Sequence, residues 1–275
     1  MPTFPQSFPM NGGDGPHSYI HNSSYQKVAI DGAKERTREA ILEKLDLELL
    51  NRNSESSILR IADFGCSIGP NTFDVVQNII DTESPALNKS YIQCNNLVDE
   101  VTKAYKIQFK KDIGGFLEAR AEELVSGGLM ILSGQCLPDG IPKALTWQGV
   151  VIDMIGDCLM DMAKLGITSK EKIELFSLPT YIPHISEFKA NIEQNENFTI
   201  ETMEEISHPM DYMPLTNDFI TSMFRAILNT IIEKHFGDGV VDELFDRLAK
   251  KLDKYPINFR RCKKYVNYFI VLKRK

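Results

Sequence analysis

The sequence has no long hydrophobic run, no closely spaced pair of cysteines and no surplus of basic residues. No stretch approaches the roughly 18 consecutive apolar residues of a membrane-spanning helix, so we expect no membrane partner. The formal net charge of −7 argues against a nucleic-acid partner, because non-specific nucleic-acid binders normally carry a basic surplus. These absences favour a soluble globular protein.

The five cysteines are scattered along the chain, at Cys66, Cys94, Cys136, Cys158 and Cys262. None has the CxxC or Cys/His spacing of a structural zinc site. An odd, scattered set is typical of a reducing compartment. Residues 1–15 are polar, rich in proline and glycine, and lack the apolar core of a signal peptide. We therefore expect a cytoplasmic protein.

Hydrophobic periodicity predicts an alternation of helices and strands. The predicted helices span 26–50, 72–80, 91–124, 146–165, 186–195, 218–235 and 240–254. The predicted strands span 58–64, 129–132, 198–202 and 265–272, and the last is expected at a sheet edge. A glycine pair between the long helix and strand 129–132 indicates a crossover back into a parallel sheet.

This order predicts an α/β fold, a Rossmann-like sheet that carries an α-helical cap. We expect the sheet domain to comprise 1–134, 196–208 and 257–275, with a flexible N-terminal arm at its start. The cap would comprise 135–195 and 209–256. With 43% hydrophobic residues, the 275-residue chain is large enough for this arrangement.

The turn Asp63-Phe-Gly-Cys-Ser-Ile-Gly-Pro-Asn71 follows the first predicted strand. Its glycines allow a tight bend and a close approach of a ligand to the backbone. The helix after it offers unpaired N–H groups to a carboxylate, and Asp63 can accept a hydrogen bond from an ammonium group. S-adenosylmethionine fits both features. A nucleotide site is disfavoured, because neither a P-loop nor a G-x-G-x-x-G motif is present. A turn that binds nothing is the other interpretation of this segment alone.

Further motifs give the turn a context. They are Met10-Asn-Gly-Gly-Asp-Gly-Pro-His-Ser-Tyr19, Asn22-Ser23-x-x-Gln26, Ser84-Pro-Ala-Leu-Asn-Lys89, Ala104-Tyr-x-x-Gln-Phe109, Phe116-Leu-x-x-Arg-Ala-Glu-Glu-Leu124, Gly127-Gly-Leu-Met130, Phe176-x-Leu-Pro-x-Tyr181 and Lys234-His-Phe-Gly237. With the turn, they resemble the plant SABATH family of S-adenosylmethionine-dependent methyltransferases over nearly the whole chain. That family methylates the carboxylates of salicylic, benzoic and jasmonic acids and of indole acetate, and the ring nitrogens of xanthines.

The resemblance implies a class-I methyltransferase fold that binds S-adenosyl-L-methionine or its product, S-adenosyl-L-homocysteine. It also implies that the N-terminal arm closes the site and that the cap forms the substrate pocket. The implied cofactor-binding residues are Tyr19, Ser23, Asp63, Gly65, Cys66 and Asn71. The implied substrate-binding residues are Tyr19, Gln26, Trp147, Tyr181, Phe224, Ile227 and Tyr265. Gln26 and Trp147 would position the methyl-accepting group. For Trp147, packing in the core of a helix is the alternative interpretation.

The implied reaction is an in-line transfer of a methyl group from a sulfonium. A carboxylate is already ionised at neutral pH, so no strong general base is required. Catalysis then consists of positioning and exclusion of water. Accordingly, no catalytic acid or base is predicted, and the five histidines are scattered.

Some members of the family bind Mg²⁺ near the mouth of the site. The matching positions here are Asn88, Glu174, Phe176 and Ser177. The family pattern has aspartate and asparagine where this chain has Glu174 and Ser177. The sequence therefore carries a weakened version of this metal site.

The chain departs from the family between Glu83 and Ser84. A class-I methyltransferase needs further strands here, one of which ends in an acid that binds the cofactor ribose. About 70–90 residues are absent, enough for three strands and their crossovers. Either the protein is a deletion or splice form, or the sequence omits a segment of an intact enzyme.

The leading hypothesis is an S-adenosylmethionine-dependent methyltransferase of the carboxylate of a small aromatic or hormone-like acid. The first alternative is N-methylation of xanthine alkaloids. The second is an inactive member of the family with a regulatory or dimerisation role, which the missing segment favours. The resemblance also implies a homodimer.

Overall fold

The computed structural model describes residues 10–13, 15–46, 99–176, 178, 181–206, 215–237, 239–259, 261–263 and 265–275, and all structural statements refer to them. The described helices are α1 (Tyr19–Asn22), α2 (Ser24–Lys44), α5 (Asp99–Glu123), α6 (Trp147–Lys164), α7 (Lys170–Glu174), α8 (Ile185–Glu193), α9 (Asn217–Phe236) and α10 (Val240–Lys254), with a 3-10 turn, η1 (Lys143–Leu145). The strands are β1 (Leu129–Cys136), β2 (Phe198–Ile206) and β3 (Val266–Arg274).

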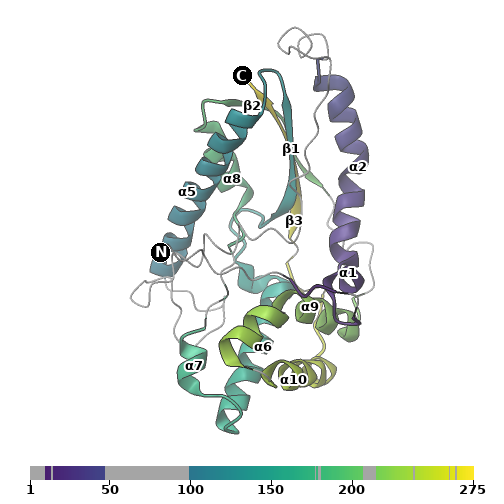
Figure 1. The fold of residues 1–275 in the computed structure, drawn as a ribbon, viewed down its shortest axis with the longest axis vertical. Coiled ribbons are helices and arrows are strands. Elements are labelled where there is room, and N and C mark those ends of the chain that lie inside the picture. Colours follow the sequence, from purple (N-terminus) through teal and green to yellow (C-terminus); the bar gives the residue numbers. More distant parts are fainter. Residues whose placement is uncertain are drawn as a thin grey trace.

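The three described strands form one sheet in the order β1-β3-β2 (Figure 1). β3 is antiparallel to both neighbours, so β1 and β2 run in the same direction. The prediction that the last strand lies at a sheet edge is wrong. Its run Phe269–Leu272 is buried at every position, because β3 is paired on both sides and covered on both faces. The predicted parallel strand 58–64 lies outside the described residues.

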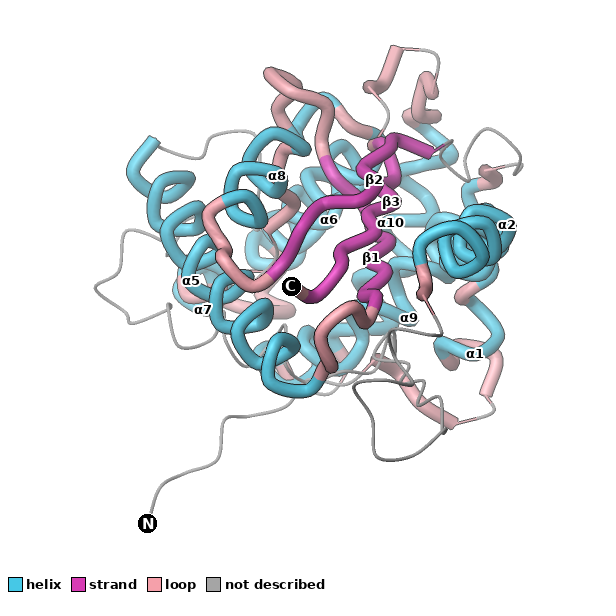
Figure 2. The backbone as a smooth tube through the Cα atoms, turned by 90° about the horizontal axis from the view of Figure 1, so that it is seen from above, coloured by secondary structure: helices cyan, strands magenta, loops and turns pink. Residues whose placement is uncertain are grey.

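Helices cover both faces of the sheet. On one face, Ala33 and Ala40 of α2 pack against Phe269 and Val271 of β3. On the other face, α5 and α8 pack against the alternate residues Ile270 and Leu272. Viewed from above, the strands lie between α2 on one side and α5 with α8 on the other (Figure 2). The period-two alternation of β3 thus divides its side chains between two apolar layers.

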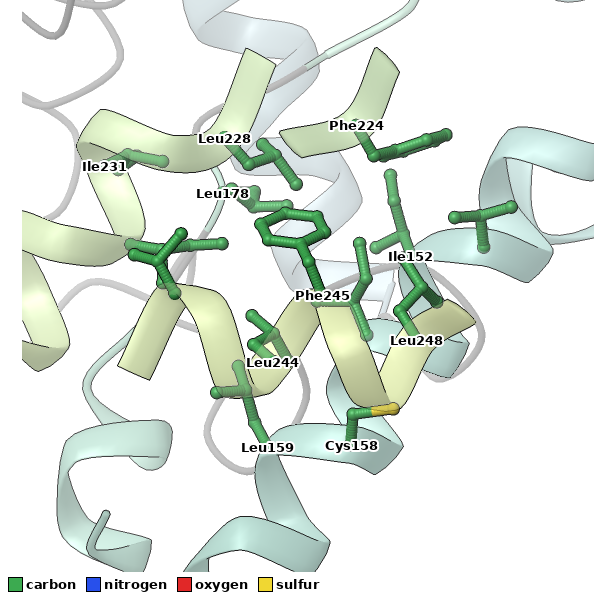
Figure 3. Packing of buried hydrophobic residues seen from close by; sticks show 14 of the residues in the cluster. Ile152, Cys158, Leu159, Leu178, Phe224, Leu228, Ile231, Leu244, Phe245 and Leu248 are labelled. Carbon is green, nitrogen blue, oxygen red and sulfur yellow. The ribbon is translucent and has the colours of Figure 1, made fainter. Parts of the chain in front are cut away.

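The helical cap consists of α6, α7, α9 and α10 and lies at one end of the sheet (Figure 1). Leu244, Phe245 and Leu248 of α10 are fully buried and pack between α6 and α9 (Figure 3). The predicted helix 240–254 has the observed bounds of α10. The predicted helix 26–50 instead ends at Lys44, because Leu45 adopts an extended conformation.

The N-terminal arm is attached to the cap. The backbone N–H of Asn11 donates to the carbonyl oxygen of Ala226 in α9, 3.1 Å away. The side-chain amide of Asn22 donates to the carbonyl oxygens of Pro16 and Ser18 and so holds the turn before α1. In the described part of the chain, no helix has both the length and the apolarity required to cross a membrane.

Candidate functional site

Trp147 is the first residue of α6, and the residues around it fix its position. The Oγ1 of Thr146 accepts a hydrogen bond from the backbone N–H of Gly149 at 3.1 Å, which caps the helix. The same hydroxyl donates to the carbonyl oxygen of Lys143 at 2.6 Å. A side chain at position 149 would collide with that carbonyl group, so glycine permits the close approach of η1 to α6.

Three aromatic rings surround the indole of Trp147, from Tyr25, Phe224 and Phe259. Each ring centroid lies 6.1 Å from that of the indole, and all three pairs meet edge to face. Trp147 has no exposed surface, yet within the described residues its Nε1 has no hydrogen-bond partner. A buried indole N–H normally finds a partner, and leaving it unpaired costs about 1–3 kcal/mol. This donor is therefore suited to an acceptor on a ligand.

Tyr25 is a functional candidate that the sequence analysis missed. Its hydroxyl accepts hydrogen bonds from the side-chain amides of Gln135, at 3.0 Å, and Gln148, at 3.3 Å. These bonds connect α2 with β1 of the sheet and α6 of the cap. The available signal was its position in the N-terminal motif, immediately before Gln26.

Several predicted residues lie around the junction of arm, sheet and cap. Tyr19 is buried in α1, and its backbone N–H donates to the carbonyl oxygen of Asn11 at 2.7 Å. Ser23 lies between α1 and α2, and its side chain does not cap α2. Gln26 lies on α2, but its side chain is outside the described part of the structure. Tyr265 is buried immediately before β3.

The predicted pocket residues on the cap have different surroundings. Phe224 of α9 packs against Trp147, and Ile227 is half-buried against the cap core. Tyr181 instead donates from its hydroxyl to Glu187 at 2.6 Å and packs against Tyr105 of α5. The structure thus brings Trp147 and Phe224 together, whereas Tyr181 contacts α5 and α8.

Burial and the neighbouring carboxylate of Glu187 raise the pKa of Tyr181 above its usual value. Burial also raises the pKa of the Cys136 thiol to about 12. Neither group is therefore ionised near neutral pH, and neither is suited to act as a nucleophile.

The predicted cofactor turn and part of the predicted metal site lie outside the described residues. These positions are Asp63, Gly65, Cys66, Asn71, Asn88 and Ser177. Glu174, the last residue of α7, forms an ion pair with Lys170 at 3.3 Å. The ring of Phe176 packs in the cap core against His235 and Phe236. Among the described residues, no group of three or more His, Cys, Asp or Glu is arranged to hold a metal ion.

Comparison with known proteins identifies the family. The model of the S-adenosylmethionine-dependent carboxyl methyltransferases matches residues 5–84 and 80–275. The chain belongs to this family. A probable S-adenosylmethionine-dependent methyltransferase of Arabidopsis thaliana is 71% identical over 362 aligned residues, covering 100% of both chains. Paraxanthine methyltransferase 2 of the same plant is 30% identical, covering 99% of each.

The described fold agrees with this assignment. A solved structure of a loganic acid methyltransferase with SAH (S-adenosyl-L-homocysteine) superposes with a TM-score of 0.83 and 32% identity, covering 97% of this chain and 99% of that one. The protein therefore has the class-I Rossmann-like methyltransferase fold and is an S-adenosylmethionine-dependent methyltransferase.

The family match also confirms the gap in this chain. The two matched segments meet within residues 80–84, where the sequence analysis places the missing strands. The alignment with the Arabidopsis relative has 362 positions, 87 more than the 275 residues of this chain. A part of the family's sheet is therefore absent from this sequence.

Proposed function

We propose that the protein methylates the carboxylate of a small aromatic or hormone-like acid. The observation that carries this proposal is the buried, unpartnered indole N–H of Trp147 within the described residues. An indole N–H can only donate, so it matches a carboxylate oxygen, which can only accept. The surrounding rings of Tyr25, Phe224 and Phe259 suit an aromatic or other apolar body.

The residues of this chain would bind and orient the acid and exclude water. Trp147 would hold one carboxylate oxygen while the aromatic rings keep bulk water from the reacting oxygen. S-adenosylmethionine, when bound, supplies the electrophilic methyl group. Because the carboxylate is ionised near neutral pH, this chain needs no side chain to remove a proton.

Features of the arm fit a bound cofactor. The Oγ of Ser18 is buried and has no hydrogen-bond partner in the described part of the structure. The adjacent Tyr19 and the nearby Ser23 are the two described residues that the family motif assigns to the cofactor. An unsatisfied hydroxyl beside these residues is consistent with a polar ligand under the arm.

A radiolabelled methyl-transfer assay with the full chain tests the proposal. The panel contains aromatic acids, jasmonate-like acids and methylxanthines. Trp147→Phe keeps an aromatic ring and removes the N–H, so we expect KM for the acid to rise about 10–100-fold. Tyr255→Phe, at an exposed position, is the control and should leave KM unchanged. Turnover on methylxanthines alone would contradict the carboxylate proposal.

The similarity to paraxanthine methyltransferase 2 supports N-methylation of a xanthine as the second candidate. The missing segment supports a third, an inactive member that acts as a regulatory or dimerisation partner. Calorimetry separates the third from the others, because a folded chain that binds no S-adenosylmethionine cannot transfer its methyl group. The homodimer, the cytoplasmic location and the Mg²⁺ site stay predictions, and sedimentation velocity tests the first of them.

A further inference from the structure

Two carboxamide side chains contact the hydroxyl of Tyr25, and a third lies opposite one of them in the sheet. Gln135 and Gln148 both donate to this hydroxyl. Asn267 of β3 is the register partner of Gln135 across the β1–β3 pair. Directly opposed residues of antiparallel strands project from the same face, with Cβ atoms about 4.5–5.5 Å apart. Asn267 therefore extends the polar group, and we call Tyr25, Gln135, Gln148 and Asn267 the Tyr25 cluster.

Hydrogen-bonding capacity remains unused in this cluster. Asn267 is only 1% exposed, and neither its Nδ2 nor its Oδ1 has a partner within the described residues. The Oε1 of Gln148 is likewise buried and unpaired there. Buried amides are almost always hydrogen-bonded, because each unpaired polar group carries the cost of its removal from water. The cluster therefore has the character of a site that a polar ligand completes.

The unpaired atoms restrict the chemistry of the ligand. All four residues of the cluster are uncharged in their ordinary states, so they provide no countercharge for a second ion. A carboxylate can satisfy donors such as the Trp147 N–H, but it cannot donate to the oxygens of Gln148 and Asn267. A hydroxyl group both donates and accepts, so it can pair with the carbonyl oxygen and the NH2 group of these amides.

We propose that the Tyr25 cluster is a subsite for a hydroxyl group on the substrate, separate from the carboxylate that receives the methyl group. The proposal rests on the proposed function in taking the ligand to be the same small acid. It assigns Asn267 and Gln148 to recognition of a hydroxylated acid. An acid without the hydroxyl leaves these amides unpaired, and sites of this kind discriminate strongly against such analogues.

The first experiment measures the thermal stability of the ligand-free protein. Asn267→Leu replaces an unpaired buried amide with an apolar side chain of similar size, so we expect the melting temperature to rise. Asn191→Leu is the control, because that amide already donates to the carbonyl oxygen of Glu187 at 2.8 Å and its loss should lower the melting temperature. Asn267→Ala guards against poor fit of leucine. A lower melting temperature for both Asn267 variants would show that the amide is already paired, and would overturn the proposal.

The second experiment measures binding by calorimetry in the presence of S-adenosylhomocysteine. The probes are benzoate and its 2-, 3- and 4-hydroxy derivatives, which move one hydroxyl around a constant acid. We expect at least one hydroxylated acid to bind about 10-fold or more tightly than benzoate, and Asn267→Leu to abolish this preference. A preference that Asn267→Leu leaves intact, or no preference in the unmodified protein, overturns the subsite.

The two proposals fail in different ways. If benzoate and its derivatives bind equally and are methylated, the proposed function stands and the subsite is wrong. If no acid binds or is methylated while methylxanthines are, the carboxylate function is wrong, and the subsite for a hydroxylated acid falls with it. The control Asn191→Leu should retain the unmodified protein's preference among the four acids.

Discussion

The hydroxyl oxygen of Thr146 lies 3.1 Å from the backbone nitrogen of Gly149 and caps the helix that begins with Trp147. This contact places the indole between the cap and the sheet. A methyl group at position 149 would collide with the carbonyl oxygen of Lys143. That oxygen belongs to the backbone, so it cannot move away by a side-chain rotation. Gly149→Ala should therefore lower the free energy of unfolding by about 2–4 kcal/mol.

Chemical denaturation checks this expectation, and α5 provides a matched control. Gly114 lies within that helix with open space around its missing side chain. Gly114→Ala should raise the free energy of unfolding by about 0.5–1 kcal/mol, because alanine favours the helix. Equal effects at the two positions would show that the approach of η1 to α6 imposes no requirement for glycine.

Asp153 of α6 should make stability depend on pH. Burial, with repulsion from Asp157, raises the pKa of its carboxyl group to about 7 in the folded protein, from an ordinary value of 3.8. The folded state therefore binds this proton more tightly than the unfolded state. The resulting stability is fully present below pH 3.8 and is lost as the pH rises toward about 7.

Asp153→Asn should remove this dependence and stabilise the protein above neutral pH. Because the side chain is only half-buried, we expect roughly 1–2 kcal/mol, well below the full value of the shift. Chemical denaturation at a series of pH values measures the slope of the free energy of unfolding against pH. Asp161→Asn is the control, since its partner Lys164 lowers the pKa of the Asp161 carboxyl. An unchanged slope in Asp153→Asn would contradict the assignment.

The described cysteines should differ in reactivity. Burial raises the pKa of Cys136 to about 12 and that of Cys158 to about 11, so both thiols stay protonated at mildly alkaline pH. Cys262 is partly exposed, and its pKa is raised less strongly. Among these three, alkylation of the native protein followed by mass spectrometry should modify Cys262 first. Rapid modification of Cys136 or Cys158 would mean that the surrounding core opens readily.

The cap core should be sensitive to truncation. Leu244 has no exposed surface, so Leu244→Ala should lower the free energy of unfolding by about 2–5 kcal/mol. Leu165 is 63% exposed, and Leu165→Ala should change the free energy of unfolding by less than about 0.5 kcal/mol. The midpoint of denaturation compares the two. Similar small effects would show that α10 is not required for the stability of the folded chain.

Sequence patterns predicted the long elements of the cap well. The helix at 240–254 was predicted with its observed bounds because its apolar residues recur at helical spacing between charged ones. The short helix α7 was missed, since five residues are too few to show a periodicity. The central place of β3 was also missed, because a strand's neighbours in a sheet depend on tertiary pairing.

The candidate site was predictable only in part. The family motif placed Trp147 in the substrate pocket, but nothing in the sequence shows that its Nε1 is unpaired. Tyr25 and Asn267 were not singled out, because their significance comes from contacts between α2, β1, β3 and α6. Such contacts join residues more than a hundred positions apart.

Trp147 is the only tryptophan in the sequence. Its indole is enclosed by Tyr25, Phe224 and Phe259, so the intrinsic fluorescence of the whole protein originates largely at the candidate site. Ligands that pair with the Nε1, or that displace Tyr25, would alter this emission without any added label. The molecule thus carries an optical probe at the position where the acid is proposed to bind.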